Sequence, residues 1–246
     1  PLRPQRPAQL AQVALRGALL GPAGVQAQEV VNVYEIPSHV SINVISNQLM
    51  HERLNQTLHH WDRHDAEQAQ AARSAQVLPK AQVNGTGLAA LTRGLAGEQA
   101  ESARATYRQA LAFHEAVIRK FSLPSGDLAV ALASSVAGAW MAYNNQPFPD
   151  PFYLPLVHQM RQRLDRPGAR LQTLSDRERT TLYESLAVAG MLLASSQITW
   201  QRNPRAPGAE ALRDRMRTQG AEALTRLLQV APDKVAIGPA GVRVQP

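Results

Sequence analysis

Two long stretches of small apolar residues constrain the fold of this chain more than any other feature. Residues 128–143 and 186–194 consist mainly of Ala, Gly, Ser, Leu and Val, and the second stretch carries no polar side chain. A helix that is apolar on every face belongs inside a bundle, and both stretches are shorter than the ~18 apolar residues of a membrane span. We therefore expect buried helices and no transmembrane span. The shared strings Leu-Ala-Val-Ala and Leu-Ala-Ser-Ser suggest two antiparallel central helices packed through small residues, or an internal duplication.

Helical spacing of apolar residues predicts further helices around these two. Tyr107, Leu111 and Ile118 share one face of a helix that ends at Leu123-Pro124, and a proline-rich loop covers residues 144–151. A third helix is expected over residues 153–164, a fourth from the capping-box sequence at residues 175–178, and a fifth from 207 to about 230. The predicted fold class is all-α, an Ala-rich bundle of four to five helices over residues 98–231.

The first 27 residues resemble a signal-like leader. Arg3, Arg6 and Arg16 precede any acidic residue, and residues 25–27 approximate a small-x-small cleavage site. This pattern predicts a periplasmic or secreted protein. A disordered leader rich in Ala, Pro and Gln is the alternative.

The segments on either side of the bundle have different compositions. Residues 28–64 begin with β-branched runs at 30–36 and 40–45, which predict a short extended element, and continue with an amphipathic helix. Residues 65–97 contain few large apolar side chains, so we expect a flexible linker there. Residues 232–246 are expected to form a C-terminal tail or a small hairpin around Gly238-Pro239-Ala240-Gly241.

The chain contains no cysteine, which excludes disulfides, thiolate nucleophiles and iron–sulfur clusters. The one candidate metal site is a histidine-rich run in the N-terminal region. His60 and His64 stand at i and i+4 on one helix face with Asp62 between them, a spacing that can present two imidazoles to a metal. Because such polar runs at a helix end are usually solvated, we favour an exposed helix terminus and expect no cofactor.

Three residues within the bundle are the candidates for catalysis. His114 is a single histidine on an apolar face, and Tyr183 and Glu184 enter the most apolar part of the fourth helix. Burial could move the pKa values of such groups toward neutrality, as general acid–base catalysis requires. A histidine bonded to a carbonyl and a glutamate paired with an arginine are the structural alternatives, and these are favoured. Enzymatic activity is therefore left open, and a protein that is not an enzyme is favoured.

Arginine dominates the positive charge, since the chain has a formal charge of +7 and lysine only at Lys80, Lys120 and Lys234. Nucleic-acid binding would need the arginines between residues 161 and 226 on one face, together with a recognition motif. Acidic residues are interleaved with these arginines and no such motif is present. Nucleic-acid binding is therefore the less favoured alternative.

Several short motifs carry a resemblance to a known family. These are Tyr107 and Phe113, followed by LPSGDLAVA at 123–131, WMAYN at 140–144 with Pro147, and LYESL at 182–186 with Gly190-Met191. Residues 98–200 thereby resemble an uncharacterised family of exported bacterial helical proteins, a domain of unknown function. The resemblance implies a helical fold and an exported location but no catalytic residues. We expect a protein-interaction or structural module with another protein as partner; the alternative is a small-molecule-binding or hydrolytic enzyme with a site in the bundle cleft.

Overall fold

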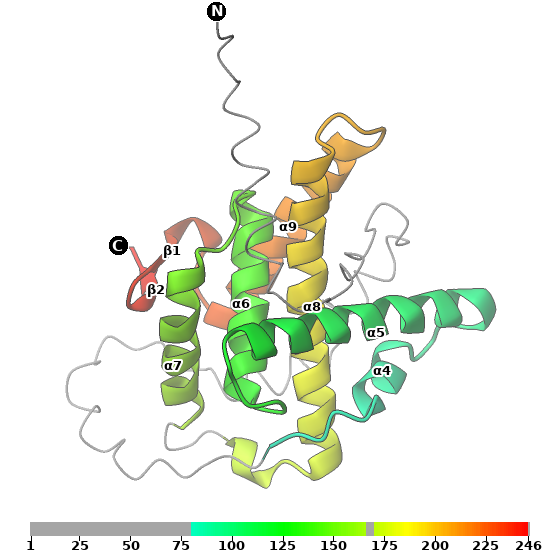
Figure 1. The fold of residues 1–246 in the computed structure, drawn as a ribbon, viewed down its shortest axis with the longest axis vertical. Coiled ribbons are helices and arrows are strands. Elements are labelled where there is room, and N and C mark those ends of the chain that lie inside the picture. The colour runs from blue at the N-terminus through cyan, green and yellow to red at the C-terminus, as the bar shows by residue number, and fades with distance from the viewer. Residues whose placement is uncertain (1–79, 166–169, 246) are drawn as a thin grey trace, which may run out of the picture. The chain divides into compact units, whose positions relative to one another are not determined.

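The computed structural model describes residues 80–165 and 170–245, which hold the predicted bundle. The leader predicted at 1–27 and the elements predicted at 28–64 lie outside the described residues. Within them the fold is all-α with one small hairpin, as predicted (Figure 1). The helices are α4 (Thr86–Leu91), α5 (Gly97–Lys120), α6 (Leu128–Asn144), α7 (Tyr153–Leu164), α8 (Asp176–Arg202) and α9 (Ala209–Leu228). The short turns are η2 (Asp150–Phe152), η3 (Arg170–Thr173) and η4 (Pro232–Lys234), and the strands are β1 (Val235–Gly238) and β2 (Gly241–Val244).

Helix α6 is the centre of the bundle and contacts α7, α8 and α9. Every residue of α6 from Leu128 to Ala139 is buried, as its apolar sequence predicts. Small residues allow the neighbouring backbones to come close. A Cβ atom on Gly138 would lie 2.0 Å from the Gly190 carbonyl oxygen of α8, and one on Gly220 of α9 would lie 2.7 Å from the Ala139 oxygen. The predicted packing of residues 128–143 against 186–194 through small residues is therefore confirmed.

The relative direction of α6 and α8 differs from the sequence-based expectation. Ser125, just before α6, and Tyr183, near the start of α8, donate to the same Glu115 oxygen, whereas Ser134 and Gly138 further along α6 lie against Gly190 further along α8. Both helices therefore run the same way, so the expectation of an antiparallel pair is wrong. The physical reason is α7, which returns antiparallel to α6 and brings the chain back to the end where α6 began (Figure 1).

Helix α5 lies crosswise over α6 and α8 (Figure 1). Its buried residues Tyr107, Ala110 and Leu111 pack with Ala187, Val188 and other residues of α8 in a second apolar cluster beside the main core. The predicted helix ending near Leu123-Pro124 is thus observed, and Ser122 adopts a positive φ of 52° in the turn that follows. Among the described residues, no helix is long and apolar enough to cross a membrane.

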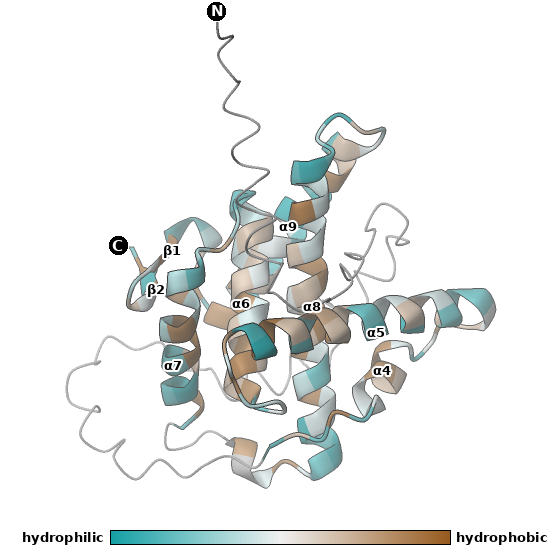
Figure 2. Cartoon of the chain, viewed as in Figure 1, coloured by the Kyte–Doolittle hydropathy of each residue, from teal (hydrophilic) through white to brown (hydrophobic). Residues whose placement is uncertain are grey.

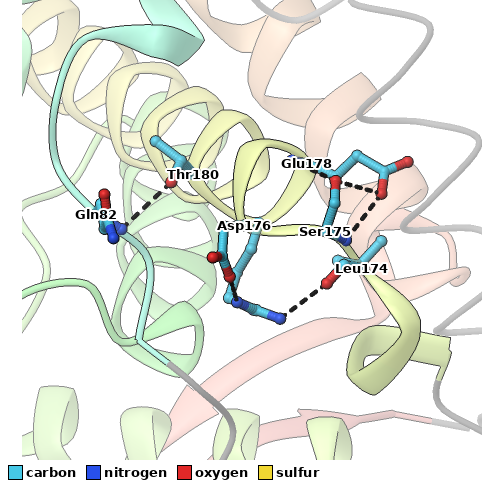
Figure 3. A network of polar contacts seen from close by, with 7 residues as sticks. Gln82, Leu174, Ser175, Asp176, Glu178 and Thr180 are labelled. Atoms are coloured by element: carbon cyan, nitrogen blue, oxygen red, sulfur yellow. Dashed lines mark hydrogen bonds and ion pairs between the residues drawn. The ribbon is translucent and has the colours of Figure 1, made fainter.

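The predicted capping box opens α8 (Figure 3). The Ser175 hydroxyl accepts a hydrogen bond from the Glu178 amide at 3.3 Å, and the Glu178 carboxylate accepts one from the Ser175 amide at 3.0 Å. These bonds satisfy backbone donors that a helix N-terminus leaves unpaired. Nearby, the buried Arg179 side chain donates to Asp176 and to the Leu174 carbonyl, which fixes the entry of α8.

The described part of the segment expected to be a linker is packed against the bundle. Residues 81–92 form an extended stretch followed by α4, in which Gly87, Leu88 and Leu91 are buried. The Ala81 amide donates to the Gly126 carbonyl at 2.9 Å, and the Gln82 amide donates to Thr180 Oγ1 at 3.2 Å (Figure 3). Polar contacts with α8 stabilise this stretch, although it contains few large apolar side chains. It therefore differs from the flexible linker expected over 65–97. Residues 65–79 of that linker lie outside the described residues.

Candidate functional site

A buried chain of three polar side chains links α5, α6 and α7. His114 Nδ1 lies 3.2 Å from Ser134 Oγ, and Ser134 Oγ lies 2.6 Å from the Tyr153 hydroxyl. Helical periodicity places His114 on the buried face of α5, and the small Ser134 lets the two helices approach. The side chains are almost completely enclosed, with exposed fractions of 0% for His114 and Ser134 and 4% for Tyr153. His114 is a candidate site residue predicted from the sequence, whereas its contacts with Ser134 and Tyr153 were not predicted.

The environment of His114 favours the neutral imidazole. Desolvation by burial lowers the pKa of His114 from 6.5 to about 4. Its Nε2 atom has no hydrogen-bond partner among the described residues. If Ser134 donates to Nδ1, the tautomer carries its proton on Nε2, whereas the reverse donation leaves Nε2 as a bare acceptor. In either case one buried nitrogen remains without a partner, at a cost of about 1–3 kcal/mol.

Tyr183 closes the same region from α8. Its ring meets the His114 ring edge to face, with centroids 5.6 Å apart. Its hydroxyl donates to Glu115 Oε1 at 3.5 Å, and the Ser125 hydroxyl donates to the same oxygen at 2.9 Å. Desolvation by burial raises the pKa of the Tyr183 hydroxyl to about 12. Burial likewise raises the pKa of Tyr153 to about 12, so both phenols remain protonated at neutral pH.

Glu184 points to a different part of the molecule from its neighbour Tyr183. Its carboxylate accepts hydrogen bonds from the backbone amides of Asn84 at 3.0 Å, Gly85 at 2.7 Å and Gly87 at 2.6 Å. A Cβ atom on Gly87 would lie 2.7 Å from both Cβ and Oε2 of Glu184, so only glycine permits this approach. The side chain is fully buried, and charge-assisted bonds to three amides offset its desolvation. The partners of Glu184 are thus backbone amides of α4 and of the residues before it, and not the arginine that was expected from the sequence.

The chemistry that this arrangement could support is limited by access. A serine next to a histidine can act as a nucleophile with its base, but the pair must also reach a substrate. Here Ser134 shares its hydroxyl with Tyr153, and the surrounding helices enclose both groups. Glu184 is engaged by α4 and does not join His114 and Tyr183. His114 and Tyr183 contact each other, whereas Glu184 contacts α4, so the three candidate catalytic residues do not meet at one site.

The candidate metal ligands His60, His64 and Asp62 lie outside the described residues. Within residues 80–165 and 170–245, no group of three or more His, Asp or Glu side chains could hold a metal ion.

The arginines between residues 161 and 226 are distributed over different environments. Arg163 and Arg179 are buried, and Arg161 forms an ion pair with Asp127. Other arginines are exposed at the end of α8, in the turn that follows it and in the first half of α9. The end of α8 is hydrophilic in Figure 2. We call this set the arginine surface: Arg202, Arg205, Arg213 and Arg217.

The described structure defines a helical bundle domain with a buried polar cluster. The chain belongs to the family of unknown function DUF6683, whose match spans residues 4–245. This match extends beyond residues 98–200, where the sequence resemblance lies. Comparison with curated proteins and with solved structures found no match.

Proposed function

We propose that this chain is an exported, non-catalytic interaction module that binds an acidic protein through the arginine surface. The observation that carries the proposal is the contrast between the two polar regions. The candidate catalytic side chains among the described residues, His114, Ser134 and Glu184, are buried and hydrogen-bonded within the fold, whereas the arginine surface is open to solvent.

The charges of the arginine surface are weakly compensated. Residues 201–217 contain the four arginines of this surface, the half-buried Arg215 and two acids, Glu210 and Asp214, so the local charge is five minus two, or three positive charges. Among the described residues, Arg202 and Arg205 have no ion-pair partner. Arg213 pairs with its exposed neighbour Asp214 at 3.5 Å, a contact worth little in water.

Aromatic packing orients one of these arginines. The Arg217 guanidinium lies 5.7 Å from the centroid of the Tyr143 ring, at the C-terminal end of α6. A cation over an aromatic face keeps its N–H groups available for carboxylates. The contact holds the Arg217 side chain in one orientation in the unbound protein, which supports a preorganised binding surface.

An acidic protein fits this surface better than a nucleic acid does. Arg163 and Arg179, which would lengthen a basic stripe, are buried within the fold. Glu210 and Asp214 interrupt the exposed set, so it lacks the continuous basic stripe that a regular row of phosphates would contact. The exported location rests on the leader-like sequence of residues 1–27.

The proposal can be tested by titrating the full chain with polyglutamate and with duplex DNA at roughly 50 and 200 mM salt. We expect polyglutamate to bind, to weaken at the higher salt, and to lose at least about tenfold in affinity in the variant Arg202→Glu/Arg205→Glu. The matched control reverses two exposed charges on α5, Arg108→Glu/Arg119→Glu, and should bind as the parent does. Stronger binding to DNA than to polyglutamate would contradict the proposal and favour the nucleic-acid alternative.

A further inference from the structure

Three residues near the end of α6 differ from the rest of this central helix. Every residue from Leu128 to Ala142 is buried except Trp140, which is half-buried, and the last turn adds the half-buried Tyr143 and the exposed Asn144. Residues three and four positions apart share one face of a helix. These three residues therefore form one face that the described helices leave partly open to solvent. We call its two large apolar residues, Trp140 and Tyr143, the aromatic stripe.

Neighbouring elements fix the aromatic stripe in place. The Trp140 ring meets the ring of Phe148, in the loop after α6, edge to face with centroids 5.9 Å apart. Helix α9 packs closely against the same end of α6, because a Cβ atom on Gly220 would lie 2.7 Å from the Tyr143 amide nitrogen. Side chains that are already ordered lose little conformational entropy when a partner binds.

The aromatic stripe is continuous with the arginine surface. Arg217 belongs to the arginine surface, and its guanidinium lies 5.7 Å from the centroid of the Tyr143 ring. Arg213 is exposed one turn earlier on the same face of α9. A ligand that binds these two guanidinium groups therefore also lies beside Tyr143, with Trp140 one turn back along α6.

Surface charge alone is a weak basis for a specific complex. Exposed ion pairs contribute little in water because solvent and salt screen them, although complementary charge does speed association. Most of the binding energy of a protein interface comes from a few well-packed residues, and Trp, Tyr and Arg are enriched among them. The aromatic stripe and Arg217 bring these three residue types together beside the other exposed arginines. An apolar contact at the stripe would therefore supply affinity that the arginines do not.

We propose that the partner is an acidic segment with a large apolar side chain, which packs on the aromatic stripe while neighbouring carboxylates bind Arg213 and Arg217. This inference rests on the proposed function and adds an apolar requirement to it. The arginines select an acidic partner and speed its association. Trp140 and Tyr143 anchor it, because aromatic side chains bury a large area when they are covered.

Two acidic peptides that differ at one position test the apolar requirement. Both consist of Glu and Gly, and one carries a central Phe where the other carries Ser. The full chain should bind the Phe peptide at least about tenfold more tightly, since burial of a Phe side chain is worth at least that factor. Trp140→Ala should remove most of this preference and leave the affinity for the Ser peptide unchanged. Phe113→Ala alters a half-buried aromatic residue on α5 and should retain the preference.

The fluorescence of Trp140 gives a second readout that leaves the aromatic stripe intact. In the variant Trp61→Phe/Trp200→Phe, Trp140 is the single remaining tryptophan. The Phe peptide at saturation should shift the Trp140 emission to shorter wavelength, because the bound Phe side chain excludes water from the indole ring. The Ser peptide should shift it much less. An unchanged emission with saturating Phe peptide would overturn the inference.

Further outcomes separate this inference from the proposed function. Equal affinity for the two peptides, with both weakened by Arg202→Glu/Arg205→Glu, would overturn the inference and leave the arginine surface as the binding site. Absence of binding of either peptide at about 50 mM salt would overturn both. A shift of the Trp140 emission with vesicles of phosphatidylserine and phosphatidylcholine, but with neither peptide, would assign the aromatic stripe to a lipid surface and overturn the inference.

Discussion

The Gly87 amide donates a hydrogen bond of 2.6 Å to the buried Glu184 carboxylate, which fixes α4 and the residues before it to α8. The contact depends on the absence of a Cβ at Gly87 and on the acceptor oxygens of Glu184. The low apolar content of residues 65–97 did not predict this contact between Gly87 and Glu184. A buried acidic side chain that accepts three backbone amides thus orders a segment that contains few apolar residues.

The first prediction concerns this contact. Glu184→Ala should lower the free energy of unfolding by about 3 kcal/mol, because three backbone amides lose a charged acceptor. Glu184→Gln retains one oxygen and should lose about half as much. Denaturant unfolding measures both changes, and amide exchange should show the loss of protection concentrated in residues 84–92. A loss spread evenly over α5–α9 would argue against a local anchor.

The second prediction concerns the closest helix contact. Gly138→Ala should destabilise the bundle by about 3 kcal/mol or more, since its Cβ would lie 2.0 Å from the Gly190 oxygen and the backbones would have to separate. Gly220→Ala is the graded comparison, because its nearest contacts are 2.7 Å away and its cost should be smaller. Thermal or denaturant unfolding of both variants gives the order. Equal stability of Gly138→Ala and the parent would refute the close approach of α6 and α8.

The third prediction concerns pH. Burial lowers the pKa of His114 to about 4, whereas the unfolded chain has the ordinary value of 6.5, so the unfolded state takes up a proton first. The contribution of His114 to stability is therefore complete above pH ~6.5 and is lost as the pH falls from 6.5 toward 4. The expected loss between pH 7 and pH 5 is about 2 kcal/mol.

Substitutions at two histidines isolate this effect. His114→Leu should remove most of the pH dependence above pH ~5, where few carboxylates titrate. His158→Gln alters an exposed histidine on α7 and should leave the dependence in place. Unfolding by denaturant at several pH values gives the comparison. An unchanged slope in His114→Leu would mean that His114 is not the group responsible.

The fourth prediction concerns the hairpin, where the Gln159 side chain of α7 accepts a hydrogen bond from the Val242 amide at 2.7 Å and donates one to the Val242 carbonyl at 2.8 Å. Gln159→Leu removes both bonds to Val242 and should cost about 1–2 kcal/mol, with faster exchange of the Val242 amide. Gln162→Leu changes an exposed amide on the same helix, one that contacts only His158 in the described structure, and should change neither quantity. If the Val242 amide exchanged at the same rate in Gln159→Leu and in the parent, its protection would have to come from another group.

The sequence predicted those parts of the fold that depend on local patterns. Apolar spacing located α5, α7 and α9, the uniformly apolar stretch located α6, and the Ser175–Glu178 pair marked the start of α8. The hairpin predicted at the C-terminus is observed around Pro239-Ala240. These signals reside in residues close together in the chain, so a single sequence contains them.

Features that depend on long-range contacts were missed or misjudged. The common direction of α6 and α8 depends on the return of the chain through α7, which apolar patterning does not specify. The contact of His114 with Ser134 and Tyr153 joins three helices, and Ser134 resembled an ordinary small packing residue in the sequence. Helix α4 was missed because its anchor, Glu184, lies 97 residues from Gly87. A glycine followed by few apolar residues is indistinguishable from a linker in sequence alone.

The measurement that tests the central claim most directly is photo-crosslinking in living bacteria that express the full chain. A photoreactive side chain replaces Arg205 in the arginine surface, and Gln109 on the exposed face of α5 is the control position. The account predicts one discrete protein adduct outside the cytoplasm from position 205, none from position 109, and loss of the adduct when Arg202 is changed to Glu. Equal adducts from both positions, or an adduct that contains nucleic acid, would contradict it.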